Sequence, residues 1–126
     1  MARVLIVVDE PDTMLELQAD MERAGHDTVL AADADTALLR LADGPIDVVV
    51  LDVMMPVGDG WTVLEHLGSH RDAPPVIVAG GRATPADLAR ASTLGATLTS
   101  PLTGPAILRA VSGAVADRAD RPAATP

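Results

Sequence analysis

The chain contains no lysine, so all nine of its basic residues are arginines. Any mechanism that needs a lysine ammonium is therefore excluded. Cysteine is also absent, which excludes disulfides and thiol chemistry and makes a cytoplasmic location the default expectation. Phenylalanine and tyrosine are missing and Trp61 is the single tryptophan. Leu, Val, Ile, Met and Ala must therefore fill the core.

Long apolar runs and an excess of positive charge are absent as well. No stretch approaches the ~18 apolar residues of a membrane span, and the start runs directly into a strand-like segment rather than a signal peptide. The formal net charge of −9 argues against nucleic acid or an anionic membrane as a direct partner. At 126 residues, the chain is long enough for one domain with a substantial core.

Apolar runs of strand length alternate with segments of helical periodicity. The predicted strands are 4–8, 28–31, 46–51, 76–79 and a weaker 96–99. Three of them are nearly continuous Val, Ile and Leu, which is typical of parallel strands covered on both faces. The intervening helices have recognisable starts or ends, at Gly25, Asp33, Gly60, Thr84 and Thr103.

Five strand–helix units in succession predict an α/β fold with a doubly wound, five-stranded parallel sheet and right-handed crossovers. Residues 1–117 are expected to form this domain and residues 118–126 a disordered tail. In such sheets, ligands gather at the carboxyl ends of the strands. Asp9 follows the first predicted strand and Asp52 the third, so the two carboxylates are expected to converge there.

Several segments together resemble the receiver domain of two-component response regulators. They are Val4-Leu5-Ile6-Val7-Val8-Asp9-Glu10-Pro11, Leu51-Asp52-Val53-Met54-Met55-Pro56, Asp59-Gly60-Trp61, Pro75-Val76-Ile77-Val78, and Leu94-Gly95-Ala96 with Ser100-Pro101. The resemblance covers roughly residues 3–116 and is most specific around Asp52. It implies the flavodoxin-like (βα)5 fold with strand order 2-1-3-4-5.

The resemblance also implies a function for the acidic residues. Asp52 would accept a phosphoryl group from a histidine kinase or phosphotransfer protein in a phosphorelay. Asp9, Asp52 and the backbone carbonyl of Met54 would bind Mg²⁺. Glu10 is a further candidate metal ligand, although a first-turn acid that interacts with the helix dipole explains it without further assumption. Output would pass through protein contacts on the face from Thr84 to Val115, without enzymatic turnover of another substrate.

Four departures from the receiver pattern weaken this site. Val8 stands where receivers carry a first acid, Gly80 replaces a hydroxyl residue, and Ser100 replaces the lysine before Pro101. The fifth strand has no aromatic switch residue.

A second register of the match to the receiver pattern would pair Asp9 with Glu10, but it moves Pro11 away from its helix start. Arg82 could supply a cation, although a solvated loop arginine is the simpler interpretation.

The free energies of the missing interactions can be compared with the energy of a phosphoryl-driven switch. A charge-assisted hydrogen bond contributes ~1.5–3 kcal/mol, and a neutral hydroxyl bond about 1 kcal/mol. Their sum rivals the ~1–3 kcal/mol of a typical allosteric coupling. Mg²⁺ binding is therefore expected to be weak or absent, and the usual phosphoryl-driven switch is not expected to survive intact.

Three functions remain open at this point. The first is a single-domain regulator with Asp52 as an impaired phosphoacceptor. The second is a pseudo-receiver that acts as a constitutive interaction module, and the third is a small-molecule sensor with residues 80–84 as a lid. Homodimerisation, and whether the chain stands alone or belongs to a longer regulator, are also left open.

The histidines give no metal-binding pattern of the usual kind. His66 and His70 are four residues apart, but Gly68-Ser69 is expected to end the helix between them. We therefore expect both rings, and that of His26, to be solvated surface groups.

Overall fold

A computed structural model describes residues 2–56, 59–70, 72–79, 83–98 and 104–120, in which strands and helices alternate. The strands are β1 (Arg3–Val7), β2 (Asp27–Ala31), β3 (Val48–Asp52), β4 (Val76–Ala79) and β5 (Thr97–Leu98). The helices are α1 (Pro11–Arg23), α2 (Ala34–Asp43), α3 (Asp59–Gly68), α4 (Pro85–Thr93) and α5 (Gly104–Asp120). No helix in these ranges is long and apolar enough to cross a membrane.

All five strands join one parallel sheet in the order β2-β1-β3-β4-β5, which confirms the predicted fold. β3 lies at the centre, and Leu51 pairs with Val7 on one side and Val78 on the other. Each of its five residues is buried because both faces of the sheet are covered. This explains the continuous apolar run before Asp52.

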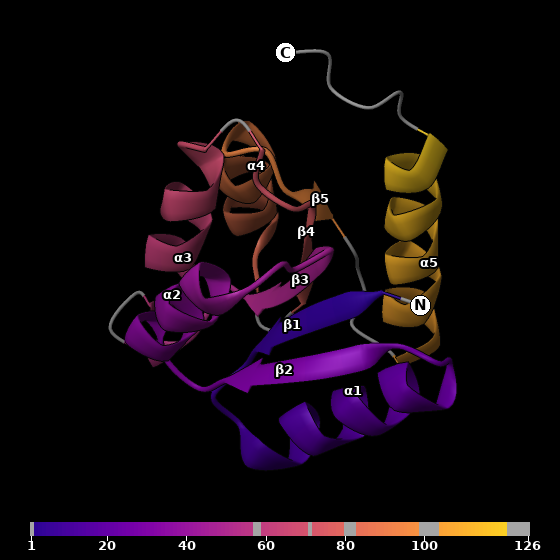
Figure 1. The fold of residues 1–126 in the computed structure, drawn as a ribbon. Coiled ribbons are helices and arrows are strands. Elements are labelled where there is room, and N and C mark those ends of the chain that lie inside the picture. Colours follow the sequence, from indigo (N-terminus) through magenta and orange to yellow (C-terminus); the bar gives the residue numbers. More distant parts are fainter. Residues whose placement is uncertain (1, 57–58, 71, 80–82, 99–103, 121–126) are drawn as a thin grey trace.

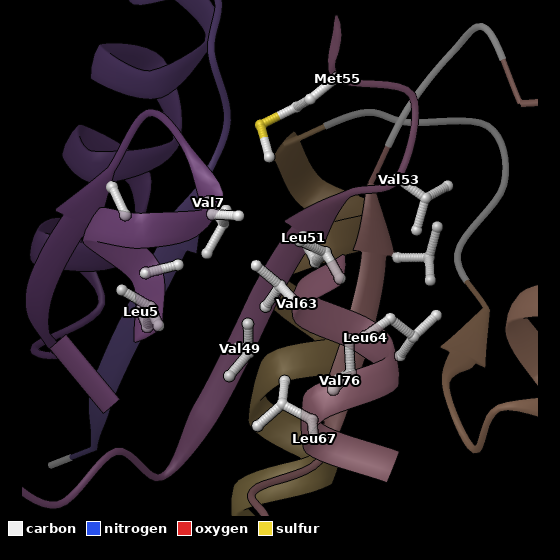
Figure 2. Packing of buried hydrophobic residues seen from close by; sticks show 14 of the residues in the cluster. Leu5, Val7, Val49, Leu51, Val53, Met55, Val63, Leu64, Leu67 and Val76 are labelled. Carbon is white, nitrogen blue, oxygen red and sulfur yellow. The ribbon is translucent and has the colours of Figure 1, made fainter. Parts of the chain in front are cut away.

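Helices cover both faces of the sheet, α1 and α5 on one and α2, α3 and α4 on the other (Figure 1). Alternate residues of each strand enter two separate cores. Leu5, Val49 and Leu51 pack toward α2 and α3, whereas Ile6 and Val50 pack toward α1 and α5. Figure 2 shows the first core, in which Val63, Leu64 and Leu67 of α3 lie beside the strand residues.

Local signals set most helix ends where the sequence predicts them. Asp33 caps α2 through the Thr36 N–H, at 2.7 Å. Gly25 and Gly95 follow α1 and α4 with φ of +89° and +97°, a backbone conformation that glycine adopts without strain.

The last helix, α5, is longer than its apolar stripe. The helix continues to Asp120, three residues beyond the predicted boundary at 117. The apolar periodicity ends near residue 117, but alanine has a high helix propensity. Alanines at positions 114, 116 and 119 therefore favour helix beyond the last apolar position. Thr103, the predicted start of this helix, and the tail residues 121–126 lie outside the described ranges.

Replacement of Thr84 by alanine tests the start of α4. Thr84 Oγ1 accepts the Asp87 N–H at 3.2 Å, and Asp87 Oδ2 accepts the Thr84 N–H at 2.8 Å, which forms a capping box. Thr84→Ala should lower the free energy of unfolding by about 1 kcal/mol in urea titrations. Ser92→Ala, on the exposed last turn of the same helix, should leave stability unchanged or slightly raised. Equal losses in the two variants would contradict this account of the cap.

Candidate functional site

Asp52 ends the central strand and is its only polar residue. The residue is 8% exposed, so its carboxylate lies at the rim of the core. Oδ1 accepts the Met54 N–H at 2.8 Å, which fixes the rotation of the side chain. Of the two residues that follow the strand, Val53 is fully buried in the core and Met54 is partly exposed. Met55 is buried as core filler, as predicted (Figure 2).

Asp9 lies beyond the end of the neighbouring strand. Val7 is paired with Leu51, and both strands run in the same direction, so Asp9 and Asp52 emerge at the same edge of the sheet. Asp9 Oδ1 is buried and has no hydrogen-bond partner among the described residues. An unpaired buried carboxylate oxygen is costly, and it marks a position where a cation or a donor is expected.

The donor set at this edge fits a magnesium ion. Carboxylate and carbonyl oxygens are the ligands that Mg²⁺ prefers, usually from few protein groups with water completing the shell. Asp9 and Asp52 supply two such carboxylates at this edge, and the Met54 carbonyl is the further oxygen that the sequence leads us to expect. Within the described ranges no cluster of three or more acidic or imidazole side chains forms a metal site, so the ion would depend on two carboxylates.

Val8 occupies the position where receivers carry a further acid, so this edge has no third carboxylate from the end of β1. Its side chain is 2% exposed and belongs to the core beneath α1 and α5. Its N–H donates to the Ala31 carbonyl at 3.1 Å, which extends the strand pairing by one residue. The position is therefore structural in this chain.

Glu10 is occupied by the start of α1. Its carboxylate accepts the Thr13 N–H at 2.6 Å, the Thr13 hydroxyl at 2.7 Å and the Asp12 N–H at 3.2 Å. These bonds, the Thr13 hydroxyl first, hold the pKa of Glu10 below its ordinary value. Of the two roles considered for Glu10, the structure supports interaction with the helix end. Glu10 is the N-cap itself, one residue before the first turn.

Gly60 holds the loop after Asp52 against α3. A Cβ atom at Gly60 would lie 2.2 Å from the Asp52 carbonyl oxygen and 2.5 Å from Val53 Cα. These neighbours are backbone atoms and have no flexible end that could move aside. The first turn of α3 therefore touches the site backbone directly, which only glycine permits.

Asp59 connects the same turn to α2. Its Oδ2 accepts the Ala34 N–H at 3.1 Å, one of the unpaired donors at the start of α2. The N-termini of two helices are thereby joined beside the loop that follows Asp52.

Trp61, next to Gly60, reaches α4. Its ring packs partly buried on the core beneath α3, and the Arg90 guanidinium lies 4.1 Å from the ring centroid. Arg90 also lies 3.5 Å from Glu65, an exposed and therefore weak ion pair. The cation–π contact is the more specific link between α3 and α4.

The chain is similar to known proteins in both sequence and fold. The family model for the response regulator receiver domain matches residues 4–108. The chain belongs to this family. Its relatives include transcriptional activator protein IrlR of Burkholderia pseudomallei, 40% identical over 72 residues, which are 57% of this chain and 31% of that protein. Regulator of RpoS of Escherichia coli is 37% identical over 93 residues, or 74% of this chain and 28% of that protein.

Solved receiver structures agree in fold. The Francisella response regulator 1452 receiver domain has a TM-score of 0.85 at 23% identity, over 94% of this chain and 99% of that one. The receiver domain of a Syntrophus aciditrophicus signal transduction histidine kinase has a TM-score of 0.83 at 25% identity, over 100% and 98%. The chain spans about a third of the length of the curated relatives, 31% of the first.

Three receiver positions singled out in the sequence lie outside the described residues. They are Gly80, Arg82 and Ser100. The described strand β5 is Thr97–Leu98 and offers no aromatic side chain.

His66, in the last turn of α3, and His70, just after it, are both exposed, as predicted. The helix does end at Gly68, as predicted, but turn hydrogen bonds continue the coil through His70. The His66 and His70 rings consequently lie with their centroids 4.4 Å apart. The ring contact itself was not predicted, although the i,i+4 spacing is the sequence signal for it.

Two glycine-to-alanine replacements test the packing at Gly60. Gly60→Ala should lower the free energy of unfolding by about 1–3 kcal/mol, because its Cβ would force the Asp52 loop away from α3. The matched control is Gly113→Ala in α5, where no atom lies within 4 Å of the added Cβ. That change should raise stability by about 0.5–1 kcal/mol. Chemical denaturation measures both, and a neutral Gly60→Ala would refute the close approach.

The Glu10 cap predicts a pH-dependent contribution to stability. Because its pKa is lowered on folding from 4.5, the contribution is present above the unfolded pKa and is lost as pH falls through the lower folded value. Glu10→Gln should therefore melt at a lower temperature than the natural chain at pH 7, and the difference should shrink below about pH 4.5. Glu16→Gln, exposed on the same helix, provides the control. A difference independent of pH would exclude the charged cap.

Proposed function

We propose that the chain is a receiver of two-component signalling in which Asp52 accepts a phosphoryl group from a phosphohistidine of a kinase or phosphotransfer protein. The observation that carries this proposal is the pair of carboxylates at one edge of the sheet, with Asp52 on the central strand and Asp9 Oδ1 buried without a partner. The chain would be a phosphoryl acceptor rather than an enzyme with a separate substrate.

The transfer uses the rigidity of Asp52. Its carboxylate oxygen attacks phosphorus in line, the P–N bond to the donor imidazole breaks, and the bonding electrons leave with that nitrogen. The product is an acyl phosphate on Asp52. The Met54 N–H holds one carboxylate oxygen at 2.8 Å, so little orientational freedom is lost on the way to reaction.

A magnesium ion would be held by Asp9, Asp52 and the Met54 carbonyl, and when bound it would neutralise charge on the phosphoryl oxygens. Without the carboxylate that Val8 replaces, the site attracts a divalent ion less strongly. The absence of lysine removes a second source of positive charge. We therefore propose weak ion binding and slow phosphorylation rather than loss of the chemistry.

The partners follow from the family and the helical surface. A histidine kinase or phosphotransfer protein would dock at the carboxyl edge of the sheet. A downstream protein would use the surface from Thr84 to Val115, part of which, 99–103, is outside the described residues. Neither nucleic acid nor a membrane is proposed as a direct partner of this acidic chain, whose net charge is −9.

Phosphorylation can be tested directly by intact-mass measurement. With acetyl phosphate and millimolar Mg²⁺, the natural chain should gain one phosphoryl group, and Asp52→Asn should gain none. Asp9→Asn should slow the reaction about tenfold or more, the equivalent of ~1.4 kcal/mol in the barrier. Asp12→Asn, an exposed acid on α1, provides the control and should react at the natural rate.

Two outcomes would count against the proposal. Absence of any mass change in the natural chain would favour the phosphorylation-independent pseudo-receiver. An unchanged gain in Asp52→Asn would show that another group is the acceptor.

A further inference from the structure

The two imidazoles at the end of α3 form a group that the phosphoacceptor site does not use. His66 and His70 are both exposed, and their ring centroids are 4.4 Å apart with a tilt of 42°. Two imidazoles that share one metal ion, at metal–nitrogen distances of about 2.0–2.1 Å, place their ring centres roughly 4.5–5 Å apart. The observed centroid separation of 4.4 Å lies just below this range, so a small rotation of the exposed side chains is what sharing an ion requires.

The hydrogen bonds of His70 select its tautomer. Its Nδ1 lies 2.7 Å from the His66 carbonyl oxygen, which can only accept, so Nδ1 carries the proton. In the neutral ring Nε2 therefore has a free lone pair. Metal-binding histidines commonly donate the other ring nitrogen to a carbonyl in this way, because the bond fixes both the tautomer and the ring orientation.

The backbone around His70 holds that ring in place. The Ser69 hydroxyl donates to the same His66 carbonyl at 2.8 Å, and the His70 N–H donates to the Leu67 carbonyl at 3.1 Å. The Ala73 N–H donates to the His70 carbonyl at 3.3 Å, so backbone hydrogen bonds close the turn on both sides of His70. A ligand held by a closed turn loses less conformational freedom on binding than one on an open loop.

We propose that His66 and His70 form a two-imidazole binding site for one late first-row divalent ion, such as Cu²⁺, Ni²⁺ or Zn²⁺. Imidazole nitrogens prefer these ions over Mg²⁺, so the site is chemically distinct from the carboxylate edge. In the described ranges no third acidic or imidazole side chain joins the pair, so water completes the coordination shell. The inference stands independently of phosphorylation at Asp52.

Binding at this position would affect the contact between two helices. A Cβ at Gly68 would lie 3.0 Å from the Leu94 carbonyl oxygen, so the end of α3 packs closely on the end of α4. An ion shared by His66 and His70 would stiffen the last turn of α3 beside this contact. The site thus borders the helix that begins the proposed output surface.

Trp61 provides the measurement because it is the single tryptophan and lies on the same helix. It is five residues from His66, about 7.5 Å along the helix axis, and a bound Cu²⁺ ion at this range quenches tryptophan fluorescence. Cu²⁺ is titrated into the full chain with millimolar Mg²⁺ present and free glycine added to mask weaker sites. We expect saturable quenching with one ion per chain.

Variants separate a metal site from a helix cap. His66→Gln and His70→Gln should each weaken the apparent Cu²⁺ affinity at least about tenfold, since one imidazole is lost from a two-point chelate. His26→Gln, which removes the remaining histidine, should bind as the natural chain does. Quenching that is unaffected by either α3 variant, or that is abolished by His26→Gln, would overturn the proposal.

A second readout excludes effects of the substitutions on folding. Cu²⁺ should broaden amide NMR signals around residues 64–72 selectively, and the spectra of the metal-free variants should match the natural chain elsewhere. Broadening centred on the residues around Asp9 and Asp52 would place the ion at the carboxylate edge and would also overturn the proposal.

Discussion

The position of Asp52 depends on direct packing between the backbone after β3 and the first turn of α3. Gly60 makes this packing possible, because any side chain there would lie within 2.2 Å of the Asp52 carbonyl oxygen. Burial of β3 fixes one side of the residue, and α3 fixes the other. The side chain of Asp52 therefore has almost no freedom to move, and this rigidity suits the proposed in-line transfer.

The same turn of α3 brings three elements together. Asp59 contacts α2 through the Ala34 N–H, Gly60 contacts the end of β3, and Trp61 contacts α4 through Arg90. Three consecutive residues thus touch three different parts of the fold. The single aromatic of the chain, Trp61, thus packs between α3 and α4.

Much of the fold could be predicted because its causes are local. Continuous Val and Ile runs indicated the parallel strands, and the side chains of Asp33 and Thr84 identified helix starts that the structure confirms. The shared edge of Asp9 and Asp52 followed from strand direction alone. These features depend on propensity and periodicity, which a single sequence displays.

Other features depend on contacts between distant segments and could not be predicted. The need for glycine at position 60 arises from the Asp52 backbone, and the Asp59 bond reaches 25 residues back to Ala34. The sequence showed the i,i+4 spacing of the histidines, but hydrogen bonds of the turn restored a contact that the helix break was expected to remove.

Helix N-termini accommodate part of the negative charge in this chain. Glu10, Asp33 and Asp87 each accept backbone N–H groups at a helix start, and Asp59 does so for a neighbouring helix. Backbone donors are available in any sequence and require no basic partner. A protein with eighteen acidic side chains and only arginine as a cation can therefore place carboxylates in stabilising positions without pairing each of them. The absence of lysine thus removes little from the framework, and its effects would be concentrated at a site where an ammonium has a chemical task.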